Sequence, residues 1–318
     1  MKIKKILAAV TAIALGASLC GCSGGETADS ADKPLIITTI FPAYDFARQV
    51  FGDTAEVRML LKPGQESHSY DPSAKDIVEI NGCDLFVYNG GESDQWVESV
   101  LQAAPDVETF RMTDAVSLLD EEHSEGMQED DHDHDHADGD EEEYDEHVWT
   151  SPDNAAAIVR ALGSRAKALF PDSAAELDSN TESYAAQIEE IDGRLKALLD
   201  GEQRYFIFGD RFPLLYFFKH YGLNYYAAFP GCGSETEPSA QTVTFLLDKL
   251  GQPDAVKAVF CIELSGRKLA DVLAEDSGLD VVEFHSCHNI TADDFDAGET
   301  YVSLMERNLQ TLEKVLVD

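Results

Sequence analysis

Short apolar runs of strand length alternate with helical patterns along most of this 318-residue chain. The run at residues 35–41 is nearly all apolar or β-branched, and a helical pattern follows at residues 43–51. A nearly continuous apolar run indicates a strand buried on both faces, and strands that alternate with helices indicate βαβ units. This rhythm predicts parallel sheets flanked by helices, which is the α/β class.

The alternation occurs twice, on either side of a long helical stretch. Before it, the pattern predicts strands at 35–41, 56–61, 85–88 and 108–112, and helices at 43–51, 73–81 and 96–104. After it, the pattern predicts strands at 204–208, 224–229, 255–262 and 281–284, and helices at 214–220, 241–250, 268–275 and 300–316. Between them, Ser151 and Pro152 begin a helix that ends near residue 169, and a second runs from about residue 173 to 199. The second helix would span roughly 40 Å at 1.5 Å per residue. We expect two lobes, each with a small parallel sheet, joined by this long helix.

The first residues have the pattern of an export signal. Three lysines at positions 2, 4 and 5 precede an apolar run at 6–19, which is too short to span a bilayer comfortably. The segment ends in Leu19-Cys20-Gly21-Cys22, similar to the lipobox of bacterial lipoproteins. That similarity implies cleavage before Cys22 and lipidation of Cys22; the alternative is an ordinary secretory signal. We therefore expect a signal peptide at 1–22 and a flexible Gly- and Ser-containing tether at 23–33.

The expected domain boundaries follow from these patterns. The N-terminal lobe covers residues 34–172, the linking helix 173–200 and the C-terminal lobe 201–318. The N-terminal lobe contains an acidic, histidine-rich loop at 120–143, which we expect to be disordered because it combines high charge with few apolar residues.

The net charge of -38 is extreme, and it argues against nucleic acid or an anionic membrane surface as a partner. Much of the charge is local, since no Lys or Arg occurs from Asp120 to Glu146. The loop's histidines are His123, His132, His134 and His136. We expect them to form an accessory site that binds metal weakly; a merely solubilising loop is the alternative.

Four cysteines follow the signal, at positions 83, 232, 261 and 287. Outside the cytosol they could form disulfides, although the sequence does not give the connectivity. Cys232 and Cys287 both follow predicted strands, and they are the pair that we expect.

Polar residues that follow the predicted strands are candidate ligands, because open parallel sheets bind at the carboxyl ends of their strands. They are His68, His147, Asp210, His285 and His288. Imidazoles with one carboxylate suit Zn²⁺, and a second carboxylate would favour Mn²⁺. Each histidine could also be an ordinary loop residue. His220 falls inside a predicted helix, where a structural role is expected, and His288 is left undecided.

The chain resembles the metal-specific solute-binding proteins of bacterial ABC importers for zinc and manganese. The resemblance covers essentially the whole mature chain. It rests on the Pro63-Gly64 to Pro72 segment with His68, and on Asp145-Glu146-His147-Val148-Trp149 followed by Ser151-Pro152. The acidic, histidine-rich insertion before the second motif is typical of the zinc members. The family's last ligand, normally an Asp before a Tyr-x-x-x-Met helix, aligns with His285 ahead of Tyr301.

One motif departs from the family. Arg211 stands at the usual third ligand position, and a permanently protonated guanidinium cannot bind a cation. Asp210, one residue earlier, is the plausible substitute. The resemblance thus implies a Zn²⁺ site formed by His68, His147 and His285, with Asp210 or water as the fourth ligand.

The leading functional hypothesis is capture of Zn²⁺ outside the membrane and delivery to the permease of an ABC importer. The expected protein is not an enzyme; it is a monomer that is lipid-anchored to the outer face of the cytoplasmic membrane. One alternative is a Mn²⁺ carrier of the same fold. Another is an exported zinc hydrolase, against which the chain has no His-Glu-x-x-His helix and no Gly-x-Ser-x-Gly turn.

Overall fold

The computed structural model describes residues 33–65, 67, 69–128, 144–231 and 237–316. Pro34–Asp318 form one compact unit by their contacts. The predicted signal peptide, Cys22, residues 23–32 of the tether, His68 and the loop histidines His132, His134 and His136 lie outside the described residues.

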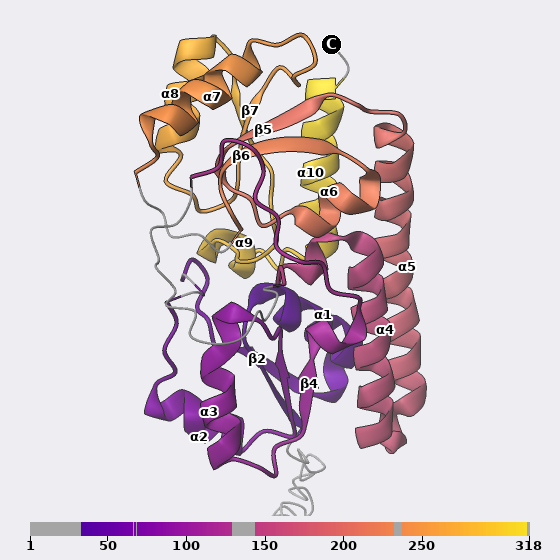
Figure 1. Cartoon of the computed structure of the whole chain (residues 1–318). Coiled ribbons are helices and arrows are strands. Elements are labelled where there is room, and N and C mark those ends of the chain that lie inside the picture. Colours follow the sequence, from indigo (N-terminus) through magenta and orange to yellow (C-terminus); the bar gives the residue numbers. More distant parts are fainter. Residues whose placement is uncertain (1–32, 66, 68, 129–143, 232–236, 317–318) are drawn as a thin grey trace, which may run out of the picture. The chain divides into compact units, whose positions relative to one another are not determined.

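The first sheet has four parallel strands in the order β2-β1-β3-β4 (Figure 1). They are β1 (Leu35–Thr38), β2 (Glu56–Met59), β3 (Leu85–Tyr88) and β4 (Thr109–Arg111). Its connecting helices are α1 (Phe41–Phe51), α2 (Ala74–Asn81) and α3 (Gln95–Ala103). Ser73 and Asp76 form a reciprocal capping box at the start of α2, so the helix begins directly after the capping residue that the sequence predicts.

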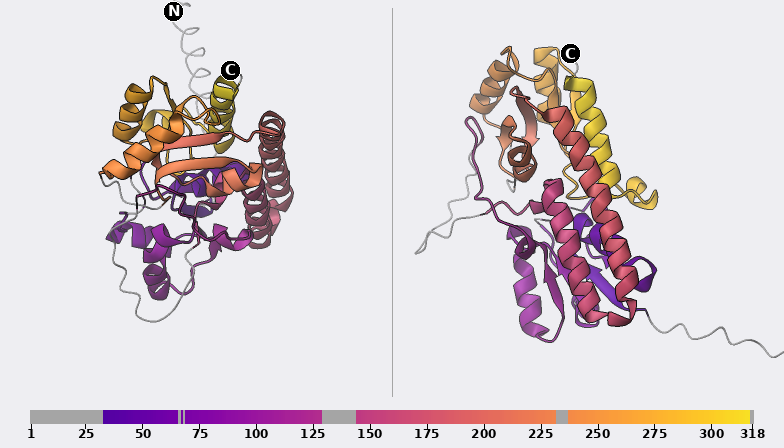
Figure 2. Two further views of the ribbon diagram at one scale, coloured as in Figure 1. Left: turned by 45° about the horizontal axis from the view of Figure 1, so that its top comes forward. Right: turned by 90° about the vertical axis from the view of Figure 1, so that its right-hand side faces the viewer.

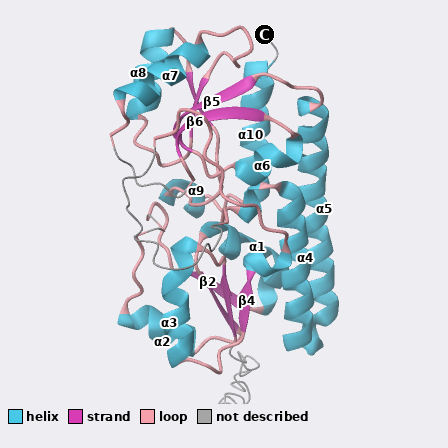
Figure 3. Cartoon of the chain, in the orientation of Figure 1, coloured by secondary structure: helices cyan, strands magenta, loops and turns pink. Residues whose placement is uncertain are grey.

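The second sheet also has four parallel strands, in the order β6-β5-β7-β8. They are β5 (Tyr205–Arg211), β6 (Asn224–Phe229), β7 (Val259–Cys261) and β8 (Val281–Glu283). The helices of this half are α6 (Leu215–Tyr221), α7 (Ala240–Leu250), α8 (Lys268–Ser277), α9 (Ala292–Asp296) and α10 (Tyr301–Leu316). Figure 3 separates the strands of the two sheets by colour from the surrounding helices. The predicted α/β class with two parallel sheets is confirmed.

Two long helices connect the halves: α4 (Pro152–Leu169) and α5 (Ala174–Leu199). They pack side by side, and Figure 2 shows α10 lying along the other end of α5. Apolar side chains of α5 join one continuous core that contains Ile36 of the first sheet and Phe208 of the second. The predicted long helix is therefore present, and it is buried along one side in both halves.

A buried carboxylate ties α1 to the second half. Asp45 accepts hydrogen bonds from the Tyr301 backbone N–H (2.9 Å) and the Arg48 guanidinium (2.8 Å), and it also receives the Tyr184 hydroxyl. Because Tyr301 begins α10 and Tyr184 lies on α5, this single side chain holds three helices in register.

The structure corrects several predicted boundaries. β1 ends at Thr38 because Phe41 and Pro42 already belong to α1, and β7 is shorter than the predicted 255–262. Helix α9 was not predicted, although Thr291 caps it. Short 3₁₀ helices occur at Gly52–Thr54, Glu92–Asp94, Met112–Ala115, Val148–Thr150 and Pro171–Ser173. Such elements are too short to produce a hydrophobic period.

Cys287 is buried, and its thiol is free among the described cysteines, so the expected pairing of Cys287 with Cys232 stays a prediction. Cys232 itself lies outside the described residues. Among the helices that the structure describes, none combines the length and the apolar character that crossing a bilayer requires.

Candidate metal centre

His147 lies between the two halves and is completely buried. The backbone N–H of His147 donates to Asp145 Oδ1 (2.7 Å), and its ring Nδ1 lies 3.0 Å from the same oxygen. Tyr216 of α6 donates its hydroxyl to the Asp145 carbonyl (2.8 Å). The short 3₁₀ helix at Val148–Thr150 then leads directly into α4, which fixes the residues after the histidine.

The environment of His147 changes its pKa in competing directions. Burial disfavours the charged ring, but the charge and hydrogen bond of Asp145 outweigh burial, and the pKa of His147 is raised. The charge of Arg211 acts against protonation. A carboxylate on Nδ1 orients the ring and leaves Nε2 as the atom that can bind a cation, which is the usual arrangement behind metal-binding histidines.

The loop after β8 is fixed by Glu263, which follows β7. One carboxylate oxygen of Glu263 accepts the Ser286 N–H (2.7 Å), and the other accepts the Ser286 hydroxyl (2.7 Å) and the His288 N–H (3.2 Å). A carboxylate that receives several donors at a strand exit holds the loop in one conformation. Cys287 takes φ +61°, and this left-handed residue reverses the chain between His285 and His288.

Hydrogen bonds join this loop to the first half. His288 Nε2 lies 2.9 Å from Ser67 Oγ, and the Gly64 N–H donates to Asn289 Oδ1 (3.2 Å). The indole N–H of Trp149 donates to the Ser286 carbonyl (3.0 Å). These contacts bring the loop after β2 and the loop after β8 together.

As a result, His147 and His288 lie against each other. Their ring centroids are 5.3 Å apart and their planes meet at 77°. Gly231 approaches the His147 ring so closely that a Cβ there would lie 3.2 Å from Cε1. A cavity of about 260 Å³ adjoins His288, and residues of both halves line it, among them Ser67, Arg211 and Glu263.

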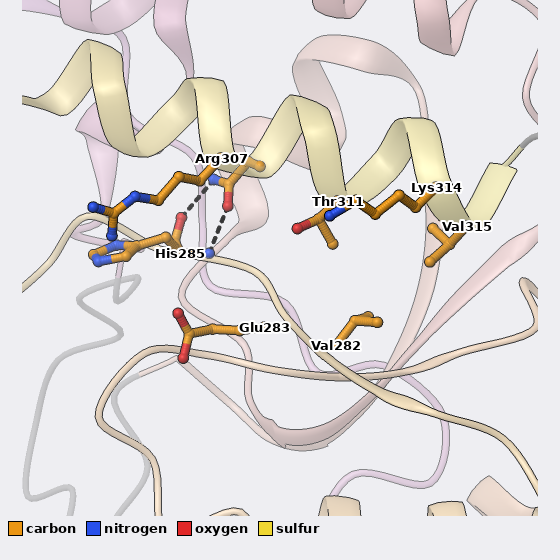
Figure 4. A pocket seen from close by; sticks show the side chains of 8 residues that line it. Val282, Glu283, His285, Arg307, Thr311, Lys314 and Val315 are labelled. Carbon is orange, nitrogen blue, oxygen red and sulfur yellow. Dashed lines mark hydrogen bonds between the residues drawn. The ribbon is translucent and has the colours of Figure 1, made fainter.

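Two of the predicted ligands, His285 and Asp210, line cavities other than the one beside His288, although His285 Nδ1 lies 3.6 Å from Glu263 Oε1 at its border. His285 lines a different cavity, of about 300 Å³, together with Glu283, Arg307 and Lys314 (Figure 4). Its ring Nδ1 accepts the Cys287 N–H (2.9 Å), and its backbone exchanges two hydrogen bonds with Asn308.

Asp210 is buried at the end of β5, where it accepts the Arg211 N–H (2.8 Å) and the Ile262 N–H (3.0 Å). Burial raises the pKa of Asp210 against these hydrogen bonds. It lines a third cavity, with Gly209 and Lys268.

Of the accessory histidines, only His123 is described, and it is exposed. His220 lies 2.8 Å from Asp192 of α5, in agreement with the structural role expected for it. Within the described ranges, no group of three or more His, Cys, Asp and Glu side chains is close enough to hold one ion. The role of His288 was left undecided from the sequence. Its position beyond a predicted strand, three residues after His285, is the signal that could have selected it.

The fold defines a class: an α/β protein of two four-stranded parallel sheets joined by a long helix, with a pair of buried or partly buried histidines in contact between its halves. A family model described as "Zinc-uptake complex component A periplasmic" matches residues 36–315, and the chain belongs to this family. The family description is that of a periplasmic uptake component, and not of an enzyme.

Individual relatives agree with this assignment. The zinc-binding lipoprotein AdcA of Streptococcus pneumoniae (strain ATCC BAA-255 / R6) is 32% identical over 98% of this chain and 60% of its own length. This chain thus spans 60% of the length of that relative. The high-affinity zinc uptake system protein ZnuA of Bacillus subtilis (strain 168) is 28% identical over 97% of this chain and 96% of its own. The crystal structure of the Zn(II)-bound ZnuA-like domain of S. pneumoniae AdcA superposes with a TM-score of 0.73, at 28% identity, over 89% of this chain and 98% of that one.

Proposed function

We propose that this protein captures Zn²⁺ outside the cytoplasmic membrane and delivers it to the permease of an ABC importer. The observation that carries the proposal is the contact between the His147 and His288 rings, 5.3 Å apart, which come from opposite halves of the fold. Membership of a zinc-uptake family supports the same cargo. A site shared by two halves binds when they close on the ion and releases when they separate.

The proposed ligands are His147 and His288, with His68 as the third. Ser67 immediately precedes His68 in the sequence, and its hydroxyl is the partner of His288 Nε2. An ion bound at that nitrogen would replace the Ser67 hydrogen bond. Imidazole nitrogens at about 2.0–2.1 Å in tetrahedral geometry are the usual zinc ligands. His285 and Asp210, which the family resemblance implies as ligands, remain the competing proposal for the second half.

Competition titration of Zn²⁺ against a chromogenic chelator separates the two ligand sets. We expect His147→Ala and His288→Ala to lower zinc affinity by more than about 100-fold, since loss of a ligand exceeds the 10–100-fold cost of losing its supporting hydrogen bond. His285→Ala and Asp210→Asn are the matched controls, and they should retain zinc binding within about tenfold. The reverse ranking would assign the site to His285 and Asp210.

The same titration with Mn²⁺ tests the choice of metal. A site dominated by imidazole favours Zn²⁺ over Mn²⁺, which follows the order of affinities of divalent ions for nitrogen ligands. Binding of Mn²⁺ as tight as that of Zn²⁺ would contradict the proposed cargo.

We further propose that Cys22 carries the lipid anchor and that the histidines of the 120–143 loop bind additional zinc weakly. The lipobox-like Leu19-Cys20-Gly21-Cys22 supports the anchor. Mass spectrometry of the membrane fraction should detect a diacylglyceryl-modified Cys22, and Cys22→Ser should release the protein.

Deletion of residues 120–142 should remove the weakly bound zinc ions and leave one tight site. An unchanged zinc stoichiometry would contradict the loop's role.

A further inference from the structure

The two residues before His147 have no regular secondary structure, yet side chains from both halves of the fold hold their carbonyl groups. Tyr216, on α6 of the second half, donates its hydroxyl to the Asp145 carbonyl (2.8 Å). The side-chain amide of Asn89, which follows β3 of the first half, donates to the Glu146 carbonyl (3.0 Å). The backbone that leads into this proposed ligand is therefore fixed from two sides.

The Tyr216 hydroxyl is the junction of a closed set of hydrogen bonds. It also accepts the Leu119 N–H (2.9 Å), and the Leu119 carbonyl accepts the Asp145 N–H (2.9 Å). Both main-chain polar groups of Asp145 are thus tied to Leu119 or to Tyr216. Tyr216 is buried, and burial raises the pKa of its hydroxyl, which therefore stays protonated and able to donate at neutral pH.

The position of the Asp145 backbone determines where the Asp145 carboxylate lies. Asp145 Oδ1 accepts the His147 N–H (2.7 Å) and lies 3.0 Å from His147 Nδ1. Because the aspartate side chain is short, a displacement of its backbone moves the carboxylate and, with it, the partner of the ring. Metal-binding side chains have to be held within about 0.5 Å of the binding geometry. The hydroxyl that fixes Asp145 consequently affects the ring of His147.

We propose that Tyr216 is a positioning residue for zinc binding: its hydroxyl fixes the Asp145 backbone and, through Asp145, holds the His147 ring in the orientation that binds the ion. The inference rests on the proposed zinc function and on His147 as a ligand. Tyr216 acts through Asp145, without contact with the ion. The second half thereby contributes to the site through Tyr216 as well as through His288.

The test is a double-mutant cycle in which zinc affinity is measured by chelator competition. Tyr216→Phe removes only the hydroxyl, and we expect zinc affinity to fall about tenfold, the lower end of the effect of losing a supporting partner. The double variant with Asp145→Asn should bind zinc within about twofold of Asp145→Asn alone, since the hydroxyl acts through that carboxylate. A purely structural role would give additive losses. Additive losses, or an unchanged zinc affinity in Tyr216→Phe, would overturn the inference.

Tyr221→Phe is the matched control, because it removes a hydroxyl from the same helix. The Tyr221 hydroxyl donates to Asp192 Oδ1 (2.9 Å), away from His147. This variant should lower the stability of the fold and leave zinc affinity within about twofold of the parent. An equal loss of zinc affinity in Tyr221→Phe and Tyr216→Phe would assign the effect to general destabilisation and overturn the inference.

Hydrogen exchange of the unmodified protein tests the same coupling without a substitution. Because coupling free energies are reciprocal, zinc stabilises the Tyr216–Asp145 junction by the factor by which the junction favours zinc. The Leu119 and Asp145 amides should therefore exchange about tenfold more slowly in saturating Zn²⁺. The Leu223 amide, which donates to the Phe218 carbonyl beyond the end of α6, should be unchanged.

Equal exchange of the Leu119 and Asp145 amides with and without zinc would overturn the inference, even if Tyr216→Phe does not fold. A parent protein that binds no zinc would instead refute the proposed function, and this inference with it.

Discussion

The two loops that hold His147 and His288 use carboxylates in different ways. Asp145 lies two residues before His147 and contacts both its backbone N–H and its ring. Glu263 lies on a neighbouring strand exit, and its hydrogen bonds to His288 and Ser286 reach backbone N–H groups and one hydroxyl. The first carboxylate therefore sets the chemistry of a ring, and the second sets the path of a loop. Their removal should affect different properties.

The largest effect expected from this difference is on stability in the second half. Glu263→Gln removes a buried charge that receives several donors, and we expect it to lower the free energy of unfolding by about 2–3 kcal/mol. Urea denaturation followed by circular dichroism measures this. The matched control is Glu283→Gln, an exposed carboxylate on β8, which should change stability by less than about 0.5 kcal/mol. Equal stability of the Glu263→Gln variant and its parent would contradict the role of Glu263 in holding the loop after β8.

The corresponding change in the first half should affect binding more than stability. Asp145→Asn keeps an oxygen for the His147 N–H but loses the charge on the ring, and we expect zinc affinity to fall about 10–100-fold, or about 1.4–2.7 kcal/mol. Chelator competition at neutral pH measures the fall. Asp153→Asn, an exposed acid in the first turn of α4, is the control. A loss of stability without a loss of affinity would show that Asp145 and Glu263 act alike.

His220 and Asp192 form a third histidine–carboxylate pair, which tests whether such a pair can contribute to stability alone. Burial disfavours the Asp192 carboxylate, but hydrogen bonds from His220, Lys196 and Tyr221 outweigh it and lower the pKa of Asp192 to about 2. Because the pKa of Asp192 is lower in the folded protein than in the unfolded chain, the carboxylate stabilises the fold at pH values above its unfolded pKa of about 3.9. This contribution is lost as the pH falls towards 2.

We expect the stability difference between the parent and Asp192→Asn to be about 1 kcal/mol at pH 5, after allowance for solvent screening, and to shrink towards pH 2. Urea unfolding over this range provides the measurement. Asp200→Asn, an exposed acid at the end of α5, should show no such pH dependence. A difference that grows on acidification would contradict the assigned direction.

The sequence predicted the elements well where a period or a cap was present. The capping box at Ser73, the Ser151-Pro152 start of α4 and the length of α5 all correspond to local signals that the structure retains. Helix α9 was missed because five residues give no period, and β7 was predicted too long because the apolar residues before Val259 are buried without belonging to the strand.

The candidate metal centre was harder to predict for a specific reason. Strand-exit reasoning gives both His285 and His288, the family resemblance favours His285, and the sequence contains no signal that Cys287 takes a left-handed conformation. Cys287 lies between the two histidines, and the structure places the ring of His288 against that of His147. Contacts such as Ser67 with His288 join residues more than two hundred positions apart, and no local pattern encodes them.

The path of α5 has a consequence for how this protein denatures. Its apolar face belongs to a core shared by both sheets, and its Tyr184 and Arg194 reach α1 and α10. Loss of either sheet would expose part of this shared face of α5, so we expect the two halves to unfold as one cooperative system. Scanning calorimetry should accordingly give a single peak, with equal calorimetric and van't Hoff enthalpies, in place of two separate melting steps.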